Sequence, residues 1–110
     1  MNAVYQVHNT LGCGFLEKVY ENALMIELRK RGLKAVQQPF IKVYYETEEV
    51  GGYFADILVD DKIILELKCV DSITNIHKAQ TINYLNASGM RLGIILNFAN
   101  PKLEYQRIVL

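Results

Sequence analysis

The sequence lacks several features that mark particular classes of protein. It has no apolar run near the roughly 18–20 residues that cross a bilayer, so we expect no transmembrane helix. The first residues, Met1–Gln6, lack the basic start and apolar stretch of a secretory signal, and a cytoplasmic protein is therefore expected. No internal repeat, low-complexity tract or Pro/Ser-rich linker divides the 110 residues, which predict a single domain over residues 1–110.

The cysteines and the net charge bear on metal binding, on the cellular compartment and on nucleic-acid binding. The two cysteines, Cys13 and Cys69, are not spaced as metal ligands, and we expect free thiols in a reducing compartment, Cys13 in a turn and Cys69 buried in a strand. The 12 basic and 12 acidic residues give a formal net charge of zero. A nucleic-acid enzyme with this balance needs its basic residues gathered on one face.

The first third of the chain has apolar residues at helical spacing. We expect one helix from about Met1 to the break at Gly12-Cys13-Gly14. A second helix is expected from Phe15 to about Arg31, where Gly32 ends it.

From Val36 the apolar period becomes that of β-strands. The expected elements are strands at Phe40–Tyr45, Tyr53–Val59 and Ile63–Val70, a helix from Thr74 or Asn75 to about Ala87, and a strand at Arg91–Phe98. A polar turn is expected over Glu46–Gly52, and a further short strand would fit residues 107–110. The order α-α-β-β-β-α-β predicts an α/β fold with a mixed sheet and helices on its faces.

Charged residues interrupt two of these apolar strands. Ile63–Val70 is apolar at nearly every position except Glu66 and Lys68, which are two residues apart and therefore share one face of the strand. Asp56 interrupts the preceding strand in the same way. Charged groups in such places are costly unless they are paired or bound to something.

The loop between the two strands decides whether the acids meet. A three-residue loop at Asp60-Asp61-Lys62 would place Asp56 opposite Glu66 at roughly 5 Å, whereas a two-residue loop would send them to different faces. Two carboxylates so close repel each other unless a cation lies between them, and they suit a hard divalent ion such as Mg²⁺.

Lys68 would lie on the same face. It could stabilise the charge that develops on a phosphate, or orient the attacking water. The ordinary alternative is a buried Glu66–Lys68 ion pair with Asp56 merely near a strand end, and the residues alone leave both interpretations open.

A longer set of motifs adds a family resemblance. Gly14-Phe15-Leu16-Glu17-Lys18-Val19-Tyr20 matches the signature that names the GxxExxY protein family, and the match continues through Phe54-Ala55-Asp56, Glu66-Leu67-Lys68, Gln80–Leu85 and Gly93–Phe98. The sequence thus resembles this family of the PD-(D/E)XK nuclease superfamily, although Ala55 stands where the superfamily's name has proline. The resemblance implies a restriction-endonuclease-like core, with a mixed central β-sheet flanked by helices.

The same resemblance implies roles for the charged residues. Asp56 and Glu66 look like the metal-binding acids and Lys68 like the catalytic lysine, and Glu17 corresponds to a helical glutamate that joins the metal site in related exonucleases. Glu17 also has an ordinary alternative: with Gly14 as the N-cap, it would stabilise the helix dipole.

Gln80 and Tyr84 match a Gln-x-x-x-Tyr motif that supports the site or contacts substrate in such enzymes. They are four residues apart and so lie on one face of a helix. Taken alone, they would be a surface amide and a half-buried aromatic.

Two functions from different classes fit the sequence. The first is a phosphodiesterase dependent on Mg²⁺ or Mn²⁺ that acts on nucleic acid, with DNA as the expected substrate and the carbonyl of Leu67 as a further metal ligand. The second is a catalytically silent binding module, which the neutral charge and small size favour. Intact Asp56, Glu66 and Lys68 favour the nuclease, and a homodimer would enlarge the basic surface that either function needs.

Overall fold

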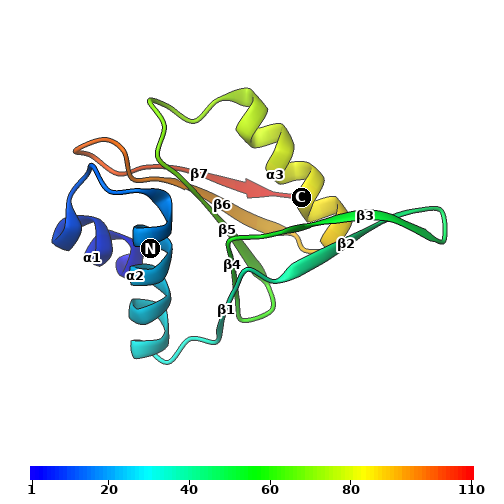
Figure 1. Ribbon diagram of the computed structural model, residues 1–110, viewed down its shortest axis with the longest axis horizontal. Coiled ribbons are helices and arrows are strands. Elements are labelled where there is room, and N and C mark those ends of the chain that lie inside the picture. Colours follow the sequence, from blue (N-terminus) through cyan, green and yellow to red (C-terminus); the bar gives the residue numbers. More distant parts are fainter.

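The computed structural model describes residues 1–110, in which three helices flank a five-stranded sheet and a two-stranded ribbon projects from the body (Figure 1). In chain order the elements are α1 (Asn2–Leu11), α2 (Glu17–Lys30), β1 (Ala35–Gln37), β2 (Phe40–Tyr45), β3 (Glu48–Phe54), β4 (Ile57–Val59), β5 (Ile63–Lys68), α3 (Asn75–Ser88), β6 (Leu92–Asn97) and β7 (Glu104–Val109).

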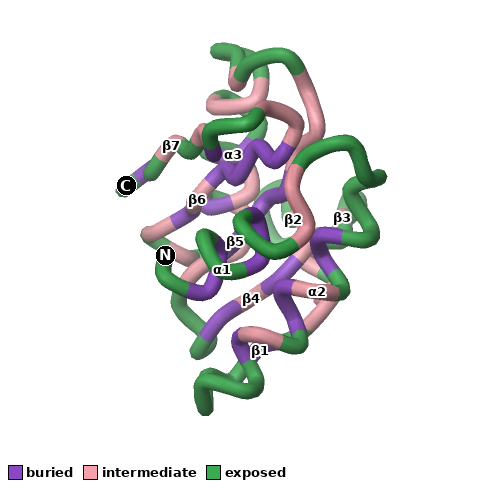
Figure 2. Tube along the Cα trace, turned by 90° about the vertical axis from the view of Figure 1, so that its left-hand side faces the viewer, coloured by how far each residue is buried: buried purple, intermediate pink, exposed green.

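The sheet has the strand order β1-β4-β5-β6-β7. Only β5 and β6 are parallel, and α3 makes the crossover between them; the other neighbours are antiparallel. One core lies between the sheet and α1 with α2, and a second, smaller core lies on the other face under α3 (Figures 1 and 2). The predicted mixed α/β sheet flanked by helices is therefore confirmed.

Tyr20 gives the Gly14–Tyr20 signature a structural role. Its buried hydroxyl donates to the Gly12 carbonyl at 2.7 Å and accepts from the Phe15 N–H at 3.3 Å. Its ring stacks on Phe98 with a centroid distance of 4.6 Å. The turn between α1 and α2 is thereby fixed to the core, at a place where Gly12 and Gly14 have φ angles of 70° and 108° that other residues rarely adopt.

Strands β1–β2 and β3–β4 form one long antiparallel ribbon with a bend. The register of β1 against β4 continues in β2 against β3 as far as the pair Val43 and Gly51, after which a bulge shifts it by one residue. At the bend, the N–H of Gln38 donates to the Asp56 carbonyl at 2.9 Å, and the N–H of Ala55 donates to the Pro39 carbonyl at 3.1 Å. Gln38 has a φ of 55°, which turns the chain sharply. The single strand expected over Tyr53–Val59 is therefore divided at Asp56 into β3 and β4.

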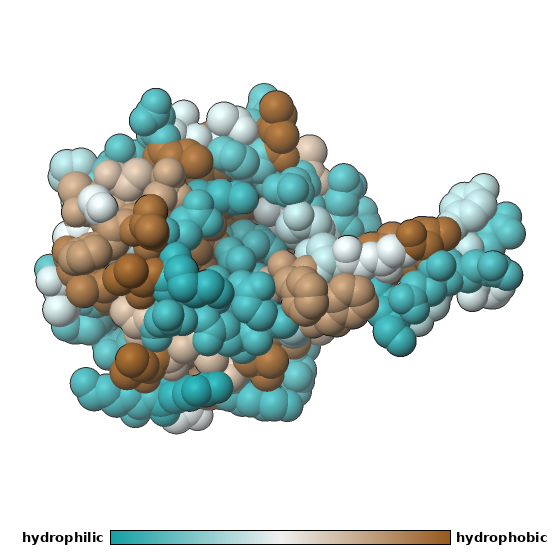
Figure 3. Space-filling model, viewed as in Figure 1, coloured by the Kyte–Doolittle hydropathy of each residue, from teal (hydrophilic) through white to brown (hydrophobic).

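The bend also changes which side of the ribbon faces the core. Ile57 and Val59 pack in the core beneath α1 and α2, whereas Tyr53 and Ala55 pack in the core beneath α3. These alternate positions would all share one face in an uninterrupted strand. The ribbon thus turns over at Asp56, and β2–β3 leaves the sheet as a projecting arm, residues 40–54 (Figures 1 and 3).

The remaining boundaries differ from expectation in small ways. The polar turn expected over Glu46–Gly52 is confined to Glu46 and Thr47, because the rest of that segment pairs as β3. The last strand begins at Glu104, since β7 pairs with β6 along its whole length. Helix α3 begins after Thr74, whose hydroxyl accepts from the His77 N–H.

The helices and the cysteines bear on two further expectations. None of the helices is long and apolar enough to cross a membrane. Both cysteines are unpaired, with Cys13 exposed in the turn as expected. Cys69 is half-buried rather than buried in a strand, because β5 ends one residue earlier at Lys68.

Replacing Tyr20 by Phe should lower the free energy of unfolding by about 1–3 kcal/mol, because the Gly12 carbonyl and the Phe15 N–H lose their partner in a partly buried place. Urea denaturation measures this change. Tyr5→Phe is the matched control, since the Tyr5 side chain is exposed. Equal stability of the Tyr20→Phe variant and the unaltered protein would contradict this role.

Candidate functional site

The loop after β4 has the length that brings the acids together. Val59 pairs with Ile63, so Asp60, Asp61 and Lys62 form a three-residue loop. Asp60 and Asp61 have φ angles of 52° and 57°, and the N–H of Lys62 donates to the Val59 carbonyl at 3.0 Å. The predicted loop length, and with it the predicted register, is confirmed.

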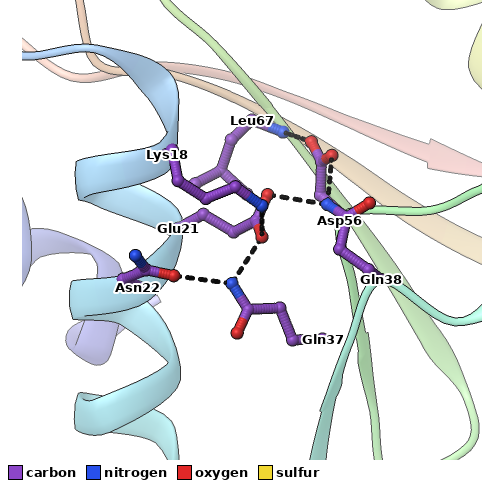
Figure 4. A network of polar contacts seen from close by, with 7 residues as sticks. All are labelled: Lys18, Glu21, Asn22, Gln37, Gln38, Asp56 and Leu67. Atoms are coloured by element: carbon purple, nitrogen blue, oxygen red, sulfur yellow. Dashed lines mark hydrogen bonds and ion pairs between the residues drawn. The ribbon is translucent and has the colours of Figure 1, made fainter.

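Asp56 lies at the bend directly before β4. The pairing of β4 with β5 ends at Ile57 and Leu65, and Asp56 lies just beyond it, beside Glu66, whose pKa the Asp56 carboxylate raises. The Oδ2 atom of Asp56 accepts the backbone N–H of Leu67 at 2.8 Å, while Oδ1 receives only a long contact, 3.4 Å, from the side-chain amide of Gln38 (Figure 4). The carboxylate is therefore oriented toward β5, with one oxygen weakly engaged.

Glu66 is the most strongly perturbed acid in the protein. Its side chain is 6% exposed, and its Oε1 atom is buried without a hydrogen-bond partner. Burial raises the pKa of Glu66 to about 9, and the neighbouring Asp56 carboxylate adds to the rise. When no cation is bound, the raised pKa favours a protonated Glu66 at neutral pH, and a hydrogen bond with Asp56 contributes to the rise.

Lys68 is half-buried two residues further along β5. Its positive charge partly offsets the rise in the Glu66 pKa, but the two side chains form no ion pair. The alternative interpretation, a buried Glu66–Lys68 ion pair, is therefore wrong.

Helix α2 contributes an acid that the sequence analysis missed. Glu21 is buried, forms an ion pair with Lys18 at 2.9 Å, and accepts the side-chain amides of Gln37 at 2.6 Å and Gln38 at 3.0 Å (Figure 4). The same Gln38 amide contacts Asp56, so one side chain links the helix to the site. Glu21 also contributes to the raised pKa of Glu66.

A signal for Glu21 exists in the sequence. It lies three residues before Leu24 and seven before Leu28, on the face of α2 that enters the core. A carboxylate on that face is anomalous in the same way as Glu66 in its strand.

Glu17 lies outside this group of buried polar residues. It is the first residue of α2, its side chain is exposed, and its charge adds to the effect of burial in raising the pKa of the Cys69 thiol. Glu17 is thus near the end of β5 but outside the hydrogen-bond network of Glu21.

The residues of the Gln-x-x-x-Tyr motif lie on α3. Tyr84 is half-buried and stacks on Tyr53, with ring centroids 3.8 Å apart, and the Tyr53 hydroxyl donates to the Tyr84 carbonyl at 3.0 Å. Burial raises the pKa of Tyr84, and the charges of Glu66 and Asp56 raise it further. Gln80 is exposed one turn earlier on the helix.

The donor set fits a lightly coordinated divalent ion. No group of three or more His, Cys, Asp and Glu side chains is arranged to hold a metal. Mg²⁺, however, is commonly held by one or two carboxylates, with waters and phosphate oxygens completing its shell. The free Oε1 of Glu66 and the weakly engaged Oδ1 of Asp56 are two such oxygens.

The two acids differ in burial, since Glu66 is buried and Asp56 is half-buried. None of the three surface cavities is lined by Asp56, Glu66 or Lys68. Of the two acids, Asp56 is therefore the more accessible to an ion from solvent.

Two solved structures are similar to this fold. SSO0001 is 16% identical with a TM-score of 0.64, and the match covers 84% of this chain and 48% of that one. An alkaline exonuclease (LHK-Exo) from Laribacter hongkongensis is 17% identical with a TM-score of 0.53, covering 84% of this chain and 55% of that one. This chain thus spans about half the length of each, and the likeness concerns the fold.

Sequence comparison gives the family. No curated protein matches this chain. The sequence model of the PD-(D/E)XK nuclease superfamily matches residues 1–108, nearly the whole length. The chain therefore belongs to the PD-(D/E)XK nuclease superfamily.

Proposed function

We propose that this protein is a nuclease that uses Mg²⁺ or Mn²⁺ to hydrolyse phosphodiester bonds in nucleic acid, with DNA as the first substrate to test. The observation that carries the proposal is the pair Asp56 and Glu66, in which a buried glutamate oxygen without a partner faces a second carboxylate. Such a pair is costly to the fold unless a proton or a cation neutralises it. Nucleases of this superfamily generally use divalent metals, which supplies the cation.

The roles of the strand residues follow from their positions. Asp56 and Glu66 would hold the ion, and the Leu67 carbonyl would be a further ligand. A divalent ion bound there supplies Lewis-acid chemistry, lowering the pKa of a bound water and withdrawing charge from the phosphate. The Leu67 N–H keeps the Asp56 carboxylate in place through the 2.8 Å hydrogen bond. Lys68 stabilises the charge that develops on the phosphate or orients the attacking water.

The helices supply supporting residues. Tyr84, held against Tyr53, and Gln80 contact the substrate or keep the site in shape. Glu17, which is exposed, would ligate the metal or orient water bound to it. Glu21 is instead connected to Asp56 by the side-chain amide of Gln38. The contacts therefore favour Glu21 as the helical acid of the site.

Three finer assignments complete the proposal. Within the superfamily, the signature Gly14–Tyr20 supports the GxxExxY family. Two unpaired thiols are consistent with a reducing, cytoplasmic location. A homodimer would bring together basic surface that a chain of zero net charge lacks.

A second candidate is a nuclease-fold module that binds a partner without cleaving nucleic acid. Zero net charge and the absence of a three-residue metal cluster favour it. The nuclease remains our proposal because Asp56, at the bend before β4, lies beside the β5 residues Glu66 and Lys68.

Labelled single- and double-stranded DNA and RNA should be cut in Mg²⁺ or Mn²⁺ and not in EDTA. Lys68→Ala should reduce the rate at least about 100-fold, because it removes a charge stabiliser from the reacting phosphate. Lys62→Ala is the matched control, since Lys62 is exposed in the loop after β4. Unchanged cutting by Lys68→Ala, or no cutting by folded protein that binds the metal, would refute the proposal.

The two helical acids can be separated by isosteric changes. Glu21→Gln should weaken Mg²⁺ binding and cleavage about tenfold or more, because Glu21 is buried beside the site and supports Asp56 through Gln38. Glu17→Gln should have a smaller effect, since Glu17 is exposed and outside that network. Isothermal titration calorimetry gives the metal affinity of each variant, and the reverse order of effects would assign the role to Glu17.

Metal binding should depend on pH through Glu66. With a pKa near 9 in the folded protein against 4.5 for the ordinary group, Glu66 keeps a proton that the unfolded chain releases. The free energy of unfolding of the metal-free protein should therefore fall as the pH rises from about 4.5 to about 9. Over the same range Mg²⁺ must displace that proton, so the apparent metal affinity should rise with pH.

Calorimetry in two buffers of different ionisation enthalpy measures the proton released on Mg²⁺ binding, and urea denaturation measures the stability. Glu66→Gln should remove the downward slope of stability, while Glu48→Gln, at an exposed position, should leave it intact. A metal affinity that stays constant across this pH range would be inconsistent with the raised pKa.

A further inference from the structure

One face of the arm carries aromatic and basic side chains in alternation. Phe40, Lys42 and Tyr44 occupy alternate positions of β2 and therefore share a face, and Phe54 of β3 pairs directly with Phe40. The Phe40 and Phe54 rings lie 5.0 Å apart. The three aromatic residues are exposed, with fractions of 49% for Phe40, 56% for Tyr44 and 61% for Phe54. These four residues are the outer face of the arm.

The opposite face of the arm is covered by the body of the protein. Ile41 and Tyr53 pack against the core beneath α3. The outer face has no such cover, and Figure 3 shows the arm standing clear of the body, with apolar surface where the two join. Single exposed apolar residues are ordinary, but several aromatics in register on a narrow ribbon mark an interaction surface.

The rings are held in place before any ligand binds. The Phe40 ring lies against Gly52 on the neighbouring strand, where it occupies the space that a side chain would need. A non-glycine residue at position 52 would also meet the Ile41 carbonyl at 2.8 Å. The Phe40 ring thus packs over Gly52, where no side chain is present, and it loses little conformational entropy when a ligand binds.

The outer face begins beside the candidate site. Phe54 precedes Asp56 by two residues, and Phe40 follows Gln38 by two. Lys42 is the next residue of the outer face along β2, and its only ion pair is a 3.9 Å contact with Glu49. The tip beyond it is acidic, with Glu46, Glu48 and Glu49, and repels phosphate.

We propose that the outer face of the arm binds single-stranded nucleic acid and leads it to the Asp56–Glu66 site. Bases of an unpaired strand can stack on Phe40, Phe54 and Tyr44, while Lys42 contacts a phosphate. A duplex hides the faces of its bases and is held chiefly by many phosphate contacts, which a chain of zero net charge does not offer. The delivery of the strand to the acids rests on the proposed nuclease function, whereas the binding itself does not.

Binding can be measured without cleavage in the Lys68→Ala protein. A fluorescein-labelled oligothymidylate is titrated in Mg²⁺, with fluorescence anisotropy as the readout, and an oligouridylate and a duplex of the same length as competitors. Single strands should bind and compete better than duplex. Adding Phe54→Ala or Tyr44→Ala should weaken binding about fivefold or more.

Two variants serve as controls. Phe40→Leu keeps an apolar cover over Gly52 but removes the ring, so it should weaken binding while thermal unfolding stays near that of the parent. Tyr45→Ala changes an exposed tyrosine at the next position, on the other face of the strand, and should leave binding unchanged.

Equal binding by the Phe54, Tyr44 and Phe40 variants, tighter binding of duplex, or no binding of any single strand would overturn the inference. So would a dimer that Phe54→Ala converts to monomer without weakening strand binding, because the face would then join two copies of the chain. The two proposals can fail separately. If single-strand binding depends on the aromatic rings but the protein with its native Lys68 cuts no substrate, this inference stands and the nuclease proposal is refuted. Cutting that depends on Lys68 but not on the rings would do the reverse.

Discussion

The hydrogen bond from the Leu67 N–H to the Asp56 carboxylate ties together the two parts of the molecule that matter most. It joins the bend of the long ribbon to the central strand β5, at the point where the ribbon turns over. Because Asp56 is held there, its carboxylate faces Glu66 and the arm departs beside the site. The position of the acids and the direction of the arm are consequences of one local geometry.

The electrostatics of the site oppose the stability of the fold. Glu66 is buried with one unpartnered oxygen, next to one acid and near a second, Glu21. A core optimised for stability alone would place an apolar residue at this position of β5, as it does at Leu65 and Leu67. The cost is offset elsewhere, by the two packed cores and by Tyr20, which fixes the turn before α2.

Much of this arrangement could be predicted from the sequence, because it follows from short-range rules. Apolar periodicity predicts the helices and the mixed sheet, and the three-residue loop at Asp60–Lys62 sets the register that brings Asp56 beside Glu66. The bend was not predicted, since it depends on a left-handed Gln38 that only the completed ribbon imposes. Glu21 was missed because its partners, Gln37 and Gln38, come from a distant strand, although its place on the core face of α2 was a usable signal.

The loop after β4 has an evolutionary consequence. Exposed loops usually tolerate insertions and deletions, because few contacts depend on their length. Here the side chains of Asp60, Asp61 and Lys62 are exposed, yet losing or gaining one residue would shift β5 against β4 and separate Asp56 from Glu66. Relatives of this sequence should therefore keep the length of this loop, and at positions 60 and 61 they should favour Asp, Asn or Gly, the residues that tolerate a positive φ.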